Sequence, residues 1–174
     1  MLLAVDPSVR SPGAALFDGT YLIAVARIPC KRVASVSDGQ HWYNVAFDIV
    51  VWADGQCAQT IANLVYEKPQ IYTARKSKGD PNDLIGLAGV GSAVAGILRA
   101  GSILSPTPAE WIGQLPKAVK GSAKDSPRSR RILSRLTPAE LTLVPDQHDA
   151  IDAVGLGLWA TGRLEPRRTF SNGR

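Results

Sequence analysis

Three apolar stretches of this chain carry acidic residues at positions where their carboxylates could meet. The run 2–5 ends at Asp6, and the run 63–66 ends at Glu67. Asp149 and Asp152 stand near the start of a third stretch, and a spacing of three places both on the same face of a helix. If the two runs are neighbouring strands, their final carboxylates lie at one edge of the sheet, where the helix could add its pair.

Four converging carboxylates need a counterion, and a hard divalent cation is the natural one. Two such ions about 4 Å apart would clamp the attacking and leaving oxygens of a phosphodiester displacement. The candidate catalytic and metal-binding residues are therefore Asp6, Glu67, Asp149 and Asp152.

Each of these acids also has a purely structural explanation. Asp6 could simply end its strand, because Asp-Pro is a common turn. Glu67 could pair with Lys68 or Arg75 at the surface. The acids at 149 and 152 could do no more than favour the positive end of a helix dipole.

Basic residues are concentrated in segments that lie between and after the acids. The net charge is +5, yet the segment 117–135 alone holds seven basic residues against one acid. Smaller basic groups occur at 75–78 and in the tail 163–174, which leaves the rest of the chain acidic. This distribution indicates an acidic centre framed by phosphate-binding arms. The candidate contacts are Arg75, Lys76, Lys78, Lys117, Lys120, Lys124, Arg128, Arg130 and Arg131.

Three further residues lie close to these groups in the sequence. Tyr72 precedes the first basic group and could stack on an unpaired base, or it could pack against its own loop. His148 stands beside Asp149 and is better explained as a helix N-terminal residue, or as one that contacts the metal ligands, than as a ligand itself. Asp146 lies three positions before Asp149 and could also assist the site.

The pattern of apolar residues and turn formers predicts how these groups are positioned. We expect strands at 2–5, 14–17 and 21–28 in an antiparallel meander, followed by strands at 63–67 and 102–107. Helices are expected at 42–62, 81–99, 126–136 and 148–162. The chain is 174 residues long and 45% apolar, which suits one α/β domain over 1–162 with a basic, flexible tail at 163–174.

The helix predicted at 81–99 is apolar or small on almost every side. Such a helix must be covered on more than one side in a water-soluble protein. Its small residues, Gly86, Gly89 and Gly91 among them, would let a second backbone approach closely. The helix could therefore form a subunit interface, or it could be sandwiched within the monomer.

The ordered set of acidic motifs resembles RuvC-type Holliday junction resolvases, including compact phage members of that family. The resemblance rests on Leu-Ala-Val-Asp-Pro-Ser at 3–8, Leu-Val-Tyr-Glu-Lys-Pro at 64–69 and His-Asp-Ala-Ile-Asp-Ala at 148–153, and it extends to about residue 162. It implies a ribonuclease H-like fold with a five-stranded mixed sheet, three antiparallel strands and then two parallel ones, flanked by helices. One departure is that some relatives have His where this chain has Asp149.

The resemblance implies a homodimeric endonuclease that cuts four-way DNA junctions in pairs with Mg²⁺ or Mn²⁺. Asp6 would bridge the ions, with Glu67, Asp149 and Asp152 as the other ligands. A nuclease for other branched DNA or for RNA–DNA hybrids is the alternative, because the acids report phosphodiester hydrolysis and not substrate shape. An actin-like ATPase would need a second Gly-rich loop and a longer chain. The four acids argue against a DNA-binding protein without catalysis, because without a metal their charges would repel phosphate.

The cellular setting follows from features at the N-terminus and from the cysteines. The chain begins with apolar residues that meet Asp6 at once, with no basic leader, so we expect a cytoplasmic protein without a signal peptide. Its longest uncharged stretch is too short to span a membrane. Cys30 and Cys57 lack partners at metal-ligand spacing and suit reduced thiols.

Overall fold

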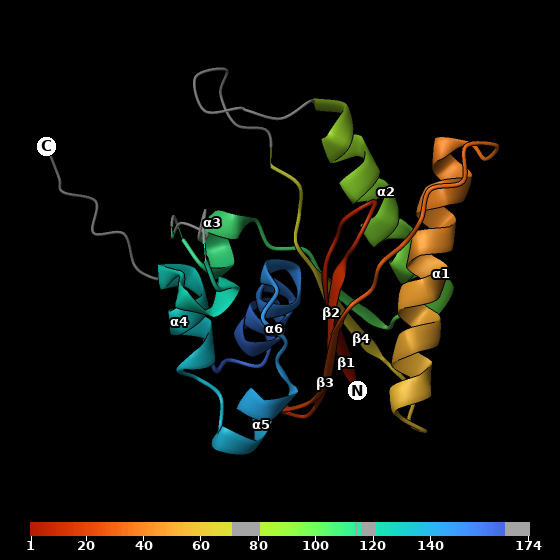
Figure 1. Cartoon of the computed structure of the whole chain (residues 1–174). Coiled ribbons are helices and arrows are strands. Elements are labelled where there is room, and N and C mark those ends of the chain that lie inside the picture. The colour runs from red at the N-terminus through yellow and green to blue at the C-terminus, as the bar shows by residue number, and fades with distance from the viewer. Residues whose placement is uncertain (71–80, 114, 116–120, 166–174) are drawn as a thin grey trace, which may run out of the picture.

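The computed structural model describes residues 1–70, 81–113, 115 and 121–165, and it contains a five-stranded mixed sheet between two layers of helices (Figure 1). The strands are β1 (Leu2–Asp6), β2 (Gly13–Asp18), β3 (Tyr21–Arg27), β4 (Asn63–Tyr66) and β5 (Ser102–Leu104), in the order β3-β2-β1-β4-β5. β1, β2 and β3 pair antiparallel, whereas β4 and β5 continue the sheet in parallel from β1. The expected fold class is confirmed.

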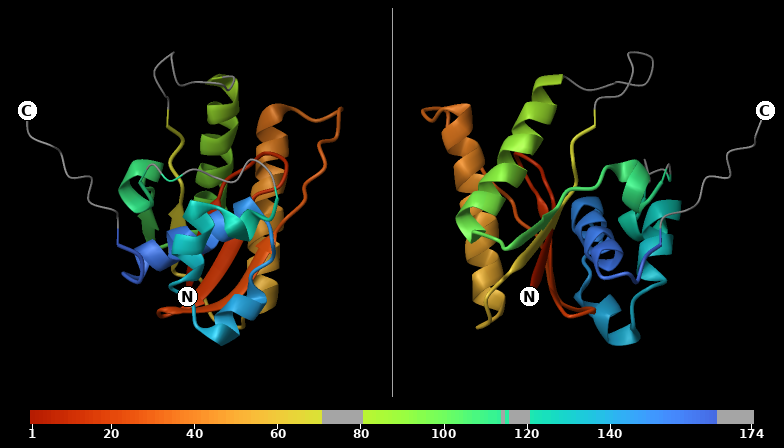
Figure 2. Two further views of the ribbon diagram at one scale, coloured as in Figure 1. Left: turned by 60° about the vertical axis from the view of Figure 1, so that its left-hand side comes forward. Right: turned by 180° about the vertical axis from the view of Figure 1, so that it is seen from behind.

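Helices cover the two faces of the sheet unequally, as Figure 2 shows from two sides. α1 (Asp38–Gln56) and α2 (Pro81–Leu98) pack on each other over one face. The other face holds α6 (His148–Ala160), with α3 (Pro108–Trp111), the 3-10 turn η1 (Ala123–Asp125), α4 (Pro127–Leu133) and α5 (Pro138–Leu143) around it. None of the helices in these described ranges is long and apolar enough to cross a membrane.

The central strand β1 is buried on both faces, which explains its unbroken apolar sequence. Leu3 and Val5 pack with the α1 and α2 layer, while Ala4 packs with the α6 layer. All three side chains are fully buried. A strand covered on both sides reads as a continuous apolar run rather than as an alternation of apolar and polar residues.

Several predicted element bounds were wrong for local reasons. α1 begins at Asp38 because the Ser37 hydroxyl accepts a hydrogen bond from the Gln40 backbone N–H. It ends at Gln56, well before the predicted 62. β5 stops at Leu104, two residues before Pro106, instead of reaching 107.

Glycines on β2 and α6 let these two elements pack closely: Gly13 lies against the backbone of α6, and Gly157 lies against the Phe17 side chain of β2. A Cβ at Gly13 would stand 1.9 Å from the Asp149 carbonyl oxygen, and one at Gly157 would stand 2.0 Å from the Phe17 ring. Both positions therefore exclude any larger residue without movement of the helix. The consequence is that the first turn of α6 lies against the first residue of β2.

The glycines of α2 serve a similar purpose inside the monomer. A Cβ at Gly86 would collide with the Val9 side chain and press on Trp42 of α1, one at Gly89 would collide with Trp42, and one at Gly91 would collide with the Tyr66 ring of β4. These small residues thus accommodate aromatic side chains of the same chain. The suggestion that they admit a second backbone is wrong for these three positions.

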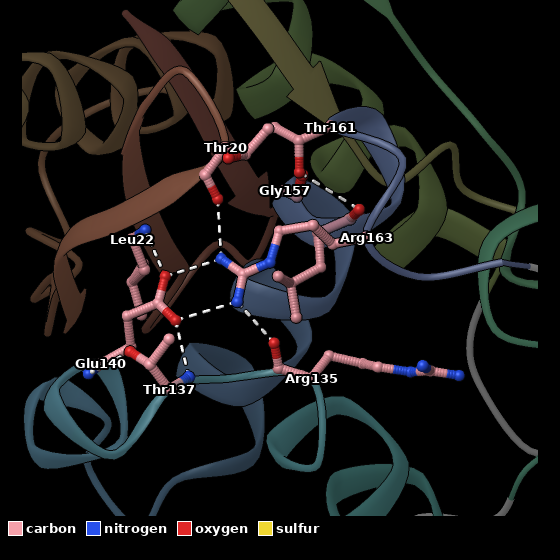
Figure 3. Close-up of polar contacts among 9 residues, drawn as sticks. Thr20, Leu22, Arg135, Thr137, Glu140, Gly157, Thr161 and Arg163 are labelled. Carbon is pink, nitrogen blue, oxygen red and sulfur yellow. Dashed lines mark hydrogen bonds and ion pairs between the residues drawn. The ribbon is translucent and has the colours of Figure 1, made fainter.

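A buried ion pair between Glu140 and Arg163 joins α5, the β2–β3 turn and the segment after α6 (Figure 3). The Glu140 carboxylate accepts hydrogen bonds from Arg163 at 2.6 and 2.9 Å, from the Leu22 N–H at 2.8 Å and from the Thr137 N–H at 2.8 Å. Arg163 also donates to the Thr20 carbonyl at 2.7 Å. Leu164, next to Arg163, is only 1% exposed.

Candidate active site

The ends of β1 and β4 bring two of the predicted acids to one edge of the sheet. Asp6 is the last residue of β1 and is 9% exposed, opposite Gly13 of β2. Glu67 directly follows β4, and its N–H donates to the Val5 carbonyl at 3.2 Å. β1 and β4 are parallel neighbours, so both chains reach this edge in the same direction. The strand adjacency expected from the sequence is present.

The first turn of α6 brings the other two acids to the same region. The close contact of Gly13 with the Asp149 carbonyl sets this turn beside the residue paired with Asp6. The Asp149 carboxylate lies 3.5 Å from Nε of Arg27, and both side chains are partly exposed. Asp152, one turn further on, is almost completely buried.

Asp152 and Glu67 are joined through two side chains of the α3–α4 region. Arg128 donates to Oδ2 of Asp152 at 3.0 Å and to the Leu115 carbonyl at 3.1 Å. Its guanidinium lies 5.8 Å from the centre of the Trp111 ring. The Trp111 indole N–H in turn donates to Oε2 of Glu67 at 2.9 Å.

This chain of contacts is shielded from water. Trp111 is fully buried, and the side chains of Arg128 and Asp152 are 12% and 2% exposed. A buried carboxylate is costly unless it is paired and hydrogen-bonded, and Arg128 meets this requirement for Asp152. The two acids are thus held at fixed positions by donors that come from elsewhere in the fold.

The chemistry of the four acids suits a hard divalent cation, but their side chains do not stand together around one point. Carboxylate oxygens are the ligands that Mg²⁺ and Mn²⁺ prefer. Within the described ranges, however, no group of three or more His, Cys, Asp or Glu side chains stands close enough to hold an ion. Asp149 and Asp152 are engaged by arginines instead. The four-ligand, two-ion centre remains a prediction.

Asp146 and His148 lie at the same end of α6 with different surroundings. Asp146 accepts hydrogen bonds from the Ser122 hydroxyl and from the Lys124 N–H, both at 2.9 Å. The Ser122 hydrogen bond, followed by that of Lys124, lowers the pKa of Asp146 below its usual value. Asp146 therefore anchors η1, while the half-buried His148 begins α6.

The predicted DNA contacts fall into three groups. Arg130 is exposed on α4, and Lys124 is half-buried in η1. Arg131 donates to the Glu165 carbonyl, while Arg128 faces the interior as described above. The remaining candidates lie outside the described residues: Tyr72, Arg75, Lys76, Lys78, Lys117 and Lys120. For all of them a role in DNA binding stays a prediction.

Sequence reasoning did not identify Trp111 and Arg27 as part of this region. Trp111 stands 44 positions from its partner Glu67, and no local spacing connects the two. Arg27 reaches Asp149 from the last residue of β3, on the far side of β2 from the acid-ended strands. Both contacts depend on the sheet order.

The sheet order and the two helix layers form a ribonuclease H-like fold, and comparison with known proteins gives solved structures that share it. The Thermus thermophilus RuvC structure matches with a TM-score of 0.57 and 13% identity, covering 95% of this chain and 99% of that one. T. thermophilus RuvC in complex with a Holliday junction substrate matches with a TM-score of 0.55 and 10% identity, covering 95% and 98%. No protein-family model matches the chain, and no curated protein matches it by sequence. The chain thus shares the RuvC fold over almost its whole length.

Proposed function

We propose that this protein is a metal-dependent endonuclease that resolves four-way DNA junctions by paired phosphodiester hydrolysis. The observation that carries the proposal is the meeting of Asp6 and Glu67 at the ends of parallel neighbours, with the first turn of α6 against them. A RuvC protein that shares this fold has been solved with a Holliday junction. Fold and acid placement together favour this function over a binding protein without catalysis.

In this proposal the chain's carboxylates hold the cation and fix it relative to the DNA. Asp6, Glu67 and Asp152 would be its ligands, with Asp149 completing the set if its contact with Arg27 opens. Bound Mg²⁺ or Mn²⁺ supplies Lewis acidity and activates water. Burial of Asp152 and the Trp111 hydrogen bond to the half-buried Glu67 limit the freedom of these two side chains, which would keep the ligands in one geometry.

The exposed basic side chains would position the DNA backbone over this edge. Arg130 lies on α4, which packs on α6 and so lies near the acids that α6 carries. Phosphate contacts of this kind give affinity without sequence preference and depend strongly on salt. The basic groups at 75–78 and 117–120, which lie outside the described residues, are further candidates for phosphate contacts.

We further propose a homodimer built on the outer face of α2. Ile85 is 58% exposed, and Ala88 and Ser92 lie on the same side of the helix at positions three and seven residues further on. These residues line a hollow of about 670 Å³ together with Tyr66 and Pro69. A two-fold axis would bury the same face on both subunits and relate two active sites symmetrically, as paired cuts require.

Cleavage of defined substrates tests the proposal. Purified protein is incubated with Mg²⁺ or Mn²⁺ and a labelled four-way junction, a matched linear duplex or an RNA–DNA hybrid. We expect paired cuts in the junction and little cleavage of the duplex. Preferential cleavage of the hybrid would instead support a ribonuclease H-type activity.

A further inference from the structure

Arg128 forms an ion pair with Asp152, the most deeply buried acid of the proposed metal centre. Its guanidinium donates to Oδ2 of Asp152 at 3.0 Å and is held from behind by the Leu115 carbonyl at 3.1 Å. The Trp111 ring covers it, so three contacts from different parts of the chain fix its position. The sequence alone indicated a solvent-facing phosphate contact at this residue.

The energetics of this contact oppose the arrival of a second cation. A guanidinium in a water-poor site repels a divalent ion at the same carboxylate more strongly than it would in bulk water. Removal of the guanidinium would also take one counter-charge from the buried Asp152 carboxylate, which favours the binding of another cation there. Both effects predict that removal of the Arg128 guanidinium increases the affinity of Asp152 for a divalent ion.

We propose that Arg128 is a stand-in cation, which neutralises Asp152 in the metal-free protein and competes with the divalent ion for that carboxylate. This inference rests on the proposed function, because it assigns Asp152 to the metal centre. Arg128 acts through Asp152 and is therefore a positioning residue. It allows the fold to keep a buried acid satisfied before the ion binds.

A consequence concerns the coupling between metal and α4. An ion that takes over Asp152 frees the Arg128 guanidinium, which lies two residues before the exposed Arg130. The same guanidinium would then be available to a phosphate of the bound DNA. Metal binding and DNA binding would support each other through this residue.

Binding of Mn²⁺ to the full chain without DNA tests the inference. Isothermal titration calorimetry compares the wild type with Arg128→Gln, and with Arg135→Gln as a control that removes an exposed charge after α4. Because Arg128→Gln removes a charged hydrogen bond that competes with the ion for Asp152, we expect this variant to bind Mn²⁺ about tenfold or more tightly. The control variant should bind like the wild type.

The rise in Tm on addition of Mn²⁺ gives a second readout that a merely structural role would not move. In EDTA, Arg128→Gln should melt below the wild type, and Mn²⁺ should raise its Tm by more than it raises that of the wild type. In an Asp152→Asn background, Arg128→Gln should no longer change the rise in Tm that Mn²⁺ produces. If Arg128→Gln does not fold, Arg128→Lys serves instead, and we expect a smaller gain in affinity because lysine cannot make both hydrogen bonds and the ring contact.

Each result decides the matter separately from the nuclease proposal. Equal or weaker Mn²⁺ binding by Arg128→Gln, with a wild type that binds the ion, would overturn the competition and leave the proposed activity standing. Failure of the wild type and of Arg128→Gln alike to bind Mn²⁺ without DNA would overturn the inference, whereas the nuclease proposal is tested separately by junction cleavage. Tighter binding that persists in the Asp152→Asn background would also contradict the inference, because the effect would not pass through Asp152.

Discussion

Replacement of Glu140 by glutamine should destabilise the fold through the ion pair with Arg163. The carboxylate is 5% exposed and accepts four hydrogen bonds, two of them from the guanidinium. A glutamine amide would turn an N–H group toward one of these donors. The pair ties α5 and the β2–β3 turn to the segment that follows α6, so its loss also loosens the helix that carries Asp149 and Asp152.

The magnitude follows from the pKa of Glu140. The Arg163 hydrogen bonds, together with those of Thr137 and Leu22, lower this pKa from 4.5 to about 2 against the opposing effect of burial. At 1.36 kcal/mol for each pKa unit, the shift corresponds to about 3 kcal/mol of stability. Because the folded pKa is depressed, this stability is fully present above about pH 4.5 and is lost as the pH falls toward 2.

Urea denaturation of the wild type and of Glu140→Gln, at pH 7 and at several lower pH values, measures this contribution. We expect a difference of about 3 kcal/mol at pH 7 that narrows as the pH falls below 4.5. Glu110→Gln is a matched control, because Glu110 caps Thr107 in an identical Thr-Pro-Ala-Glu motif but is exposed. A difference that stays constant with pH, or equal losses in the two variants, would refute the reasoning.

Three further predictions concern function. Asp6→Asn should abolish junction cleavage while circular dichroism and junction binding in EDTA stay close to wild type; near-normal cleavage would remove Asp6 from the metal centre. Arg130→Ala should lower the slope of log binding constant against log salt by about 0.9 on duplex DNA, and an unchanged slope would mean that Arg130 does not touch the backbone. Ile85→Arg should split the dimer in sedimentation runs without unfolding it, whereas a wild type that is already monomeric at micromolar concentration would refute the α2 interface.

The order of strands and helices could be predicted because each strand has a local signature. The runs that end in Asp6 and Glu67 are buried on both faces or nearly so, which makes them continuous and easy to recognise. Helix limits were harder to place, since α1 begins at a Ser37 cap that precedes any apolar periodicity. The apolar character of α2 could be seen in the sequence. Which side of α2 packs inside the monomer, and that Ile85 lies on an exposed side, could not.

The candidate acids could be listed from the sequence, but their partners could not. Arg128 lies 24 positions from Asp152, and Arg27 lies still further along the chain from Asp149. In a basic segment every arginine has the same local pattern, so nothing distinguishes the buried Arg128 from the exposed Arg130. Only the packing of α4 on α6 separates their roles.

The most direct test of the central claim is cleavage of a labelled four-way junction by the purified wild type in Mg²⁺ or Mn²⁺, with a matched linear duplex beside it and Asp6→Asn as the inactive control. We predict symmetric paired cuts in the junction that require the divalent ion and disappear in the Asp6→Asn variant. Absence of metal-dependent junction cleavage by the folded wild type, or equal cleavage of junction and duplex, would contradict the claim.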